Sequence, residues 1–134
     1  MFGFSTWKRN SDIRRLNKDA PLIVEYTRQT TRAETVREVA RVTAQHIGHA
    51  RKIFEPTPIG LKRAIVEYER LHREARRQHD QISLSAFTLV LIYIRAEGFG
   101  EDCRPALDTI DAFIAQWEHA HKNDTEPTMM QRDC

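Results

Sequence analysis

One segment, residues 84–94, restricts the possible folds of this chain more than any other. Apart from Ser85 and Thr88, every residue in it is apolar. Its β-branched residues would suit a strand, but the rest of the chain offers no second convincing strand to pair with it. As a helix it has no polar side, and such a helix is either central in a core or covered by a partner chain.

Both ends of this apolar segment carry helix boundary signals. Asp80 and Ser83 are alternative N-caps, since a short polar side chain there accepts a hydrogen bond from a free backbone N–H. Gly98 follows at the position where a helix usually ends. We therefore expect a helix that begins after one of these caps and extends through Ala96.

Two further long helices are expected before it. Thr31 and Glu34 have the spacing of a capping box, and beyond them apolar residues recur every three or four positions as far as Phe54. The two prolines in residues 55–58 end this helix. Thr57 then caps the next helix, with proline at its first position. The apolar stripe of that helix is Leu61, Ile65, Tyr68, Leu71, His72 and Ala75.

Shorter pieces lie at the two ends. Residues 12–18 and 21–28 have the pattern of two short helical segments, and a last helix opens at Pro105, has Asp102 as its cap and ends at Ala120. Beyond it the chain has no period. The sequence thus predicts an all-α fold: a small bundle of about three long helices, a C-terminal helix and short N-terminal segments. It comprises one domain over 1–121 and a flexible tail over 122–134.

Composition sets the broad class. The chain has 134 residues, of which 40% are hydrophobic and 30% charged, enough apolar material for one core. Two cysteines cannot staple a fold, so a reducing compartment is expected. Neither a secretory signal nor an apolar run of the roughly 20 residues that a bilayer requires is present. We expect a cytoplasmic protein with no membrane association.

The two parts of the chain differ in charge. Residues 1–79 hold 17 Lys/Arg against 9 Asp/Glu, whereas residues 80–134 hold 4 against 10, which together give the net charge of +2. Such asymmetry either marks a surface that binds an oppositely charged partner, or means that the two parts partly neutralise each other when folded or dimerised.

Several histidines have spacings found at metal sites. Glu69 and His72 form one half of a two-metal carboxylate motif, but no second Glu-x-x-His is present. His46 with His49, and His119 with His121 after Trp117 and Glu118, lack a third ligand at a supporting spacing. We therefore expect ordinary helix histidines, with no metal and no cofactor.

Two motifs suggest other functions, and the lack of catalytic motifs argues against an enzyme. His46-Ile47-Gly48 resembles the acceptor of a histidine phosphotransfer domain, unless Gly48 serves to let another helix approach closely. The Arg-rich residues 61–79 suggest a helical nucleic-acid-binding module, although Glu67, Glu69 and Glu74 interleave with the arginines. No phosphate loop, catalytic triad or activated cysteine is present, so we do not expect an enzyme.

Several short sequence matches, in the same order and at similar spacings, suggest a family. They are Pro21-Leu22-Ile23, Thr27-Arg28, Glu34-Thr35-Val36, Phe54 with Pro58, and His79-Asp80-Gln81-Ile82-Ser83. In this order and at about these spacings, residues 20–95 resemble the TraM family of quorum-sensing antiactivators of conjugative plasmids. The chain departs from the family in its additional helix over 104–120. A tyrosine of the family falls near Leu71, whereas Tyr68 lies one turn earlier.

The resemblance implies a homodimer that binds a LuxR/TraR-type transcription activator. Binding would keep the activator off its DNA site and so repress conjugal transfer genes. The helix that matches the family's binding helix carries Tyr68, Arg70 and Leu71, which are the expected partner contacts. Under this hypothesis the protein does not bind nucleic acid itself.

Overall fold

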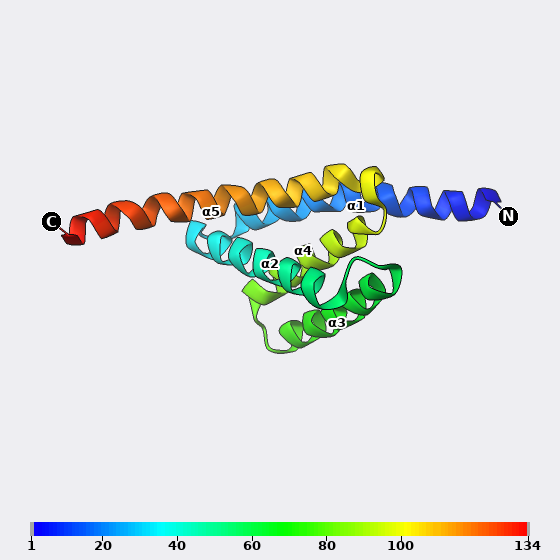
Figure 1. Cartoon of the computed structure of the whole chain (residues 1–134), viewed down its shortest axis with the longest axis horizontal. Coiled ribbons are helices and arrows are strands. Elements are labelled where there is room, and N and C mark those ends of the chain that lie inside the picture. Colours follow the sequence, from blue (N-terminus) through cyan, green and yellow to red (C-terminus); the bar gives the residue numbers. More distant parts are fainter. Residues whose placement is uncertain (1, 134) are drawn as a thin grey trace.

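The computed structural model describes the backbone of residues 2–133 and the side chains of residues 7–118. Its elements are α1 (Phe2–Thr30), α2 (Ala33–Phe54), α3 (Pro58–Arg77), α4 (Gln81–Glu97), the short 3-10 helix η1 (Gly100–Cys103) and α5 (Arg104–Asp133). Within the described backbone no residue lies in a strand, so the all-α prediction is confirmed (Figure 1). No helix in this part of the chain is both long and apolar enough to cross a bilayer.

The apolar segment forms α4, which lies at the centre of the bundle. It packs against α1, α2, α3 and α5. Ala86, Leu89 and Val90 have no exposed surface, and Leu91 and Ile92 on other sides of the helix are also buried. Of the two explanations for an all-apolar helix, central burial is therefore correct. Because the apolar residues of α4 are largely buried within one chain, its apolar character does not by itself require a partner chain, and the homodimer stays a prediction.

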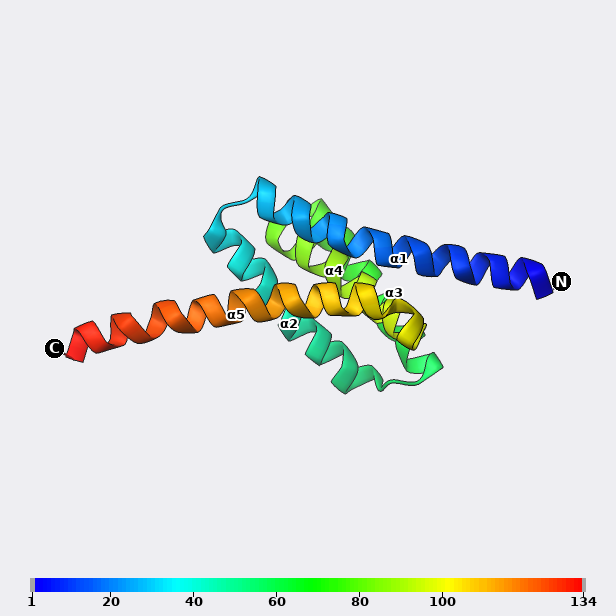
Figure 2. The ribbon, with the colours of Figure 1, turned by 90° about the horizontal axis from the view of Figure 1, so that it is seen from above.

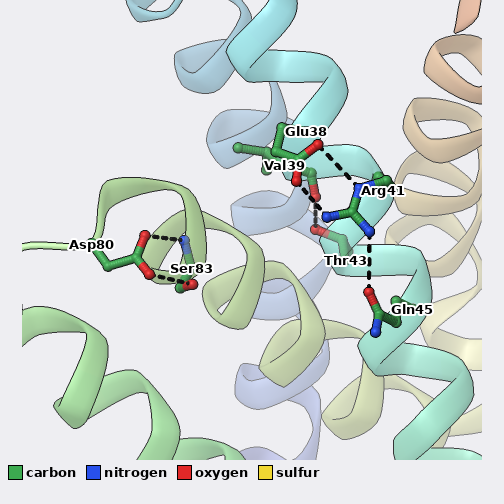
Figure 3. Close-up of polar contacts among 7 residues, drawn as sticks. All are labelled: Glu38, Val39, Arg41, Thr43, Gln45, Asp80 and Ser83. Atoms are coloured by element: carbon green, nitrogen blue, oxygen red, sulfur yellow. Dashed lines mark hydrogen bonds and ion pairs between the residues drawn. The ribbon is translucent and has the colours of Figure 1, made fainter.

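Of the two alternative caps, Asp80 occupies the N-cap position of α4, and Ser83 lies inside the first turn of the helix. Asp80 Oδ1 accepts a hydrogen bond from the backbone N–H of Ser83 at 3.1 Å, and Ser83 Oγ donates to Asp80 Oδ2 at 2.7 Å (Figure 3). These bonds hold the pKa of Asp80 below its usual value. Gly98 does follow the helix but keeps right-handed backbone angles, and the left-handed glycine is Gly100, with φ of 61°.

The N-terminal part differs from its prediction. Instead of two short segments, α1 is one continuous helix with Pro21 inside it. Proline removes one backbone hydrogen bond, but Leu16, Ala20, Val24 and Thr27 are buried on both sides of it. Packing of this continuous stripe outweighs the local preference of Pro21 to start a helix.

The cap predicted for α2 is also wrong. Arg32 occupies the N-cap position without a side-chain hydrogen bond, whereas the Thr31 hydroxyl donates to the carbonyl of Thr27 at 2.6 Å and so completes the end of α1. Thr57 does cap α3, because its hydroxyl accepts a hydrogen bond from the N–H of Gly60 at 3.0 Å. The predicted core stripe of α2 is confirmed by the burial of Val36, Val39, Ala40, Thr43, Ile47 and Ala50.

The last helix is longer than predicted. α5 runs through Asp133 instead of ending at Ala120, and Asp102 lies in η1, where it pairs with Arg9 at 2.6 Å. The buried residues of α5 are Ala106, Leu107, Ile110 and Phe113. The division into a domain over 1–121 and a flexible tail over 122–134 stays a prediction.

The helices are arranged so that α3 is set apart from the two terminal helices. α1 and α5 lie side by side and run in the same direction (Figures 1 and 2). Among the described helices α3 contacts α2 and α4 but neither α1 nor α5. In Figure 1 it lies at the side of the bundle opposite α5. One long side of α3 is therefore left uncovered.

Candidate functional site

Tyr68, one of the expected partner contacts, lies in the core. Its side chain is 1% exposed. The hydroxyl donates to the carbonyl of His46 at 3.2 Å and lies 3.0 Å from His46 Nδ1. Burial raises the pKa of Tyr68 to about 12. In this conformation Tyr68 joins α3 to α2 and does not reach a surface that a partner can touch.

The other two expected contacts lie on different sides of α3. Leu71 is half-buried and packs against the core. Arg70 is exposed and forms an ion pair with Glu67, one turn earlier. The structure therefore leaves only Arg70 of the three predicted residues fully available to a partner.

The histidines make contacts between helices. The ring of His46 packs edge-on against Phe87, with ring centres 5.0 Å apart, and burial together with neighbouring His49 lowers the pKa of His46. His72 Nε2 lies 3.1 Å from the hydroxyl of Thr88, which itself donates to a backbone carbonyl of α4. Burial and then the positive charge of Arg76 lower the pKa of His72. Both rings thus favour the neutral form.

No metal centre is assembled in the part of the chain whose side chains are described. There, no three His, Cys, Asp or Glu residues are placed to share an ion. Glu69 pairs with Arg95 at 3.5 Å instead of joining His72. Cys103 is buried, and burial raises the pKa of its thiol. The His119 and His121 side chains lie outside the described residues.

Gly48 does not have the packing role considered for it. It is exposed, and a Cβ placed there would meet nothing within 4 Å. No other helix therefore approaches α2 closely at this point. Next to it, His46 is half-buried and held against Tyr68, whereas His49 is exposed.

Exposed apolar and basic side chains are grouped on one side of α3. We call it the outer face of α3, and its residues are Ile59, Lys62, Arg63, Val66, Arg70 and Arg73. Ile59 is 67% exposed and Val66 63% exposed. They lie seven residues apart, on the side of the helix away from the core stripe. In the sequence, only this seven-residue spacing indicates the outer face, and it is less obvious than the apolar stripe of the core.

The apolar part of the outer face lies beside the corner between α2 and α3. Phe54, Ile59 and Val66, with Lys62, Arg63 and Glu67, line an open depression of about 430 Å³. The corner is tight, because a Cβ on Gly60 would lie 1.6 Å from the carbonyl oxygen of Phe54. Gly60 therefore fixes the position of the depression relative to α2.

The charges of α3 are not balanced within the chain. Each of its three glutamates already has an arginine partner: Glu67 with Arg70, Glu69 with Arg95 and Glu74 with Arg77. Among the described residues, no ion pair is formed by Lys62, Arg63, Arg73 or Arg76. The outer face of α3 is thus a basic surface with an apolar depression at one end.

α1 and α5, which are neighbours in the fold, carry opposite net charges. α1 has six Lys/Arg against three Asp/Glu, and α5 beside it has three against six. Arg9 of α1 pairs with Asp102 just before α5. An acidic helix therefore lies beside the basic α1, whereas α3 contacts neither α1 nor α5.

Comparison with known proteins does not assign a family, since no family model, no curated protein and no solved structure matches this chain.

Proposed function

We propose that this chain is an antiactivator that binds a LuxR/TraR-type transcription activator and keeps it off its DNA site. One structural observation supports this proposal. The helix that resembles the family's binding helix exposes Ile59 and Val66 among cations without carboxylate partners. Exposed apolar side chains grouped within a polar rim are typical of protein-binding surfaces.

The proposed contacts differ from those expected from sequence. We propose Ile59, Val66 and Arg70 as direct contacts, because all three are exposed on one side of α3. Tyr68 would act from the core by holding that helix against α2, and Leu71 would support it by packing against the core. Arginine suits the edge of such a surface because it pairs with carboxylates while its stem covers apolar area.

We also propose that the protein acts as a homodimer. Because most of α4 is buried within one chain, we propose another surface for that contact. Leu22 and Tyr26 are both exposed large hydrophobic residues one turn apart on α1. They offer a small apolar patch on a different helix from the proposed activator contacts.

A second candidate function is nucleic-acid binding by α3. The four cations without partners, Lys62, Arg63, Arg73 and Arg76, favour it. Ile59 and Val66 disfavour it, because apolar side chains gain little beside a phosphate backbone. Binding through about six phosphates would weaken roughly 10³-fold over a fourfold rise in salt, a dependence that a largely apolar protein contact would not show.

The test uses a purified LuxR-type activator bound to a labelled duplex that contains its site. Adding the protein should release the duplex at near-stoichiometric concentration, and the protein alone should not shift it. If the activator stays on the duplex at a tenfold excess of protein, or if the protein alone shifts the duplex tightly and with strong salt dependence, the antiactivator proposal is wrong.

A further inference from the structure

We infer that the outer face of α3 binds an acidic amphipathic helix of its protein partner. This inference deepens the proposed function, on which it rests for the identity of the partner as a protein. It concerns the chemistry of the segment that docks, which neither the sequence nor the resemblance specifies.

The apolar part of the face suits a helix. Ile59 and Val66 lie two turns apart, roughly 10.5 Å along α3, and the depression beside them extends to Phe54 at the end of α2. An amphipathic helix presents apolar side chains at the same two-turn repeat. Two such side chains can therefore cover Ile59 and Val66 together, whereas a single extended residue covers one of them.

The positive charge of the outer face indicates which charged residues the docking helix carries beside its apolar stripe. Lys62 and Arg63 line the depression, and Arg73 lies two turns beyond Val66 along the same side. None of these three cations has a carboxylate partner among the described residues. A docking helix with Asp or Glu flanking its apolar stripe would supply those partners, and one with Lys or Arg would be repelled.

A second copy of this chain is a poorer occupant. Its acidic helix is α5, which lies on the opposite side of the bundle from α3 (Figure 1). If α5 of one copy docked on α3 of another, each copy would keep an unused α3 or α5. Such head-to-tail contacts form open chains unless a ring closes, and they do not form a two-fold dimer.

A basic docking face limits how an activator would be blocked. A DNA-contacting surface is rich in Lys and Arg because it meets phosphates. The basic outer face of α3 would be repelled by such a surface. It would therefore dock on an acidic helix outside the DNA-contacting surface, and the protein would block DNA binding by position or by a conformational change in the activator, not by imitating DNA.

The test measures fluorescence anisotropy of two labelled peptides of about 14 residues, long enough for a few helical turns. Both carry leucine at i, i+3, i+4 and i+7. One has glutamate at the remaining charged positions and the other has lysine. The full chain should bind the glutamate peptide and not the lysine peptide. Circular dichroism of every variant checks that the fold is kept.

Variants locate the binding. Val66→Ser and Lys62→Glu/Arg63→Glu should each weaken binding of the glutamate peptide about tenfold or more. Val66→Leu, which keeps an apolar side chain, should not weaken it. The control Arg14→Glu/Lys18→Glu changes the net charge by the same amount on α1, at exposed residues without ion pairs. It should leave peptide binding unchanged.

Several results would overturn the inference: no binding of the glutamate peptide, equal binding of both peptides, or an equal loss in the α1 control. Tighter binding of a plain DNA duplex that is lost in the same variants would identify a nucleic-acid surface instead. A different result is expected if the proposed function is wrong but this inference is right. In that case the glutamate peptide would bind as expected, but the LuxR-type activator would stay on its duplex.

Discussion

At the corner between α2 and α3, one position leaves no room for a side chain. The Cβ of an alanine at Gly60 would overlap the carbonyl oxygen of Phe54, and Glu55 O would lie 2.5 Å away. Both atoms belong to the backbone, so a rotamer change cannot relieve the overlap. The position of the apolar depression on α3 therefore depends on a buried glycine at this corner.

We predict that Gly60→Ala lowers the free energy of unfolding by about 2–4 kcal/mol, because the corner must open to admit the methyl group. Gly48→Ala is the matched control, since its Cβ would meet nothing. It should stabilise the protein by up to about 1 kcal/mol through helix propensity. Urea unfolding measures both, and equal effects of the two substitutions would contradict the tight corner.

The two half-buried histidines predict how stability depends on pH. The pKa values of His46 and His72 are lowered mainly by burial. The unfolded chain therefore binds more protons than the folded one as the pH falls below about 6.5. Their contribution is complete above that pH and is lost on acidification. Glu97 acts in the opposite direction, because burial raises its pKa.

The measurement compares the free energy of unfolding at pH 7 and pH 5 for the wild type and for His46→Gln/His72→Gln. The wild type should lose more stability than the variant over this interval, so that the difference isolates the histidines from Glu97. An identical change in both proteins would show that neither ring titrates differently on folding.

At the scale of the elements, α1 provides the sharpest test. As a continuous helix it lacks one backbone hydrogen bond at Pro21. Pro21→Ala should then stabilise the protein, by an amount of about 1–3 kcal/mol. If residues 12–18 and 21–28 were instead two short helices, Pro21 would occupy a favourable first position and its replacement would bring no gain. Thermal and urea unfolding distinguish the two.

Sequence patterns located the helices best where local signals and burial agreed. The apolar run of α4 with Asp80 before it, and Thr57 with Pro58 at the start of α3, gave both the existence and the start of their helices. The patterns misled where packing outweighed a local preference, as at Pro21, and where Thr31 had a nearer acceptor in Thr27. Length was also underestimated for α5, whose last turns carry no apolar period.

The candidate face on α3 was only partly predictable. The sequence pointed to α3 and to the exposed Arg70, but Tyr68 lies on the stripe that the core requires. Ile59 and Val66 stood outside that stripe as isolated apolar residues, which are common on surfaces. Their importance depends on two facts that no local pattern contains: α3 has one uncovered side, and its glutamates are already paired.

In the whole molecule, the excess positive charge of α3 lies apart from the acidic helix α5. α1 and α5 lie together with opposite net charges, whereas α3 remains basic on the other side. If the protein dimerises through α1, as proposed, α3 stays free for a different partner. Two surfaces with separate roles would let a dimer present two copies of the outer face of α3.

We predict a homodimer at micromolar concentration that uses the patch on α1. Leu22→Ser/Tyr26→Ser should shift the sedimentation coefficient towards the monomer, because both side chains are exposed in the single chain and gain burial only in a dimer. Val66→Ser should leave the dimer intact. A folded wild-type protein that sediments as a monomer under these conditions would contradict the prediction.

We propose that the outer face of α3 captures a transcription activator. The concentration of protein that releases half of a LuxR-type activator from its DNA site tests this proposal. For Ile59→Ser/Val66→Ser this concentration should rise by about tenfold or more, with thermal stability unchanged because both side chains are exposed. Arg14→Glu/Lys18→Glu on α1 should release the activator as the wild type does. Release by the α3 variant at the wild-type concentration would contradict the account.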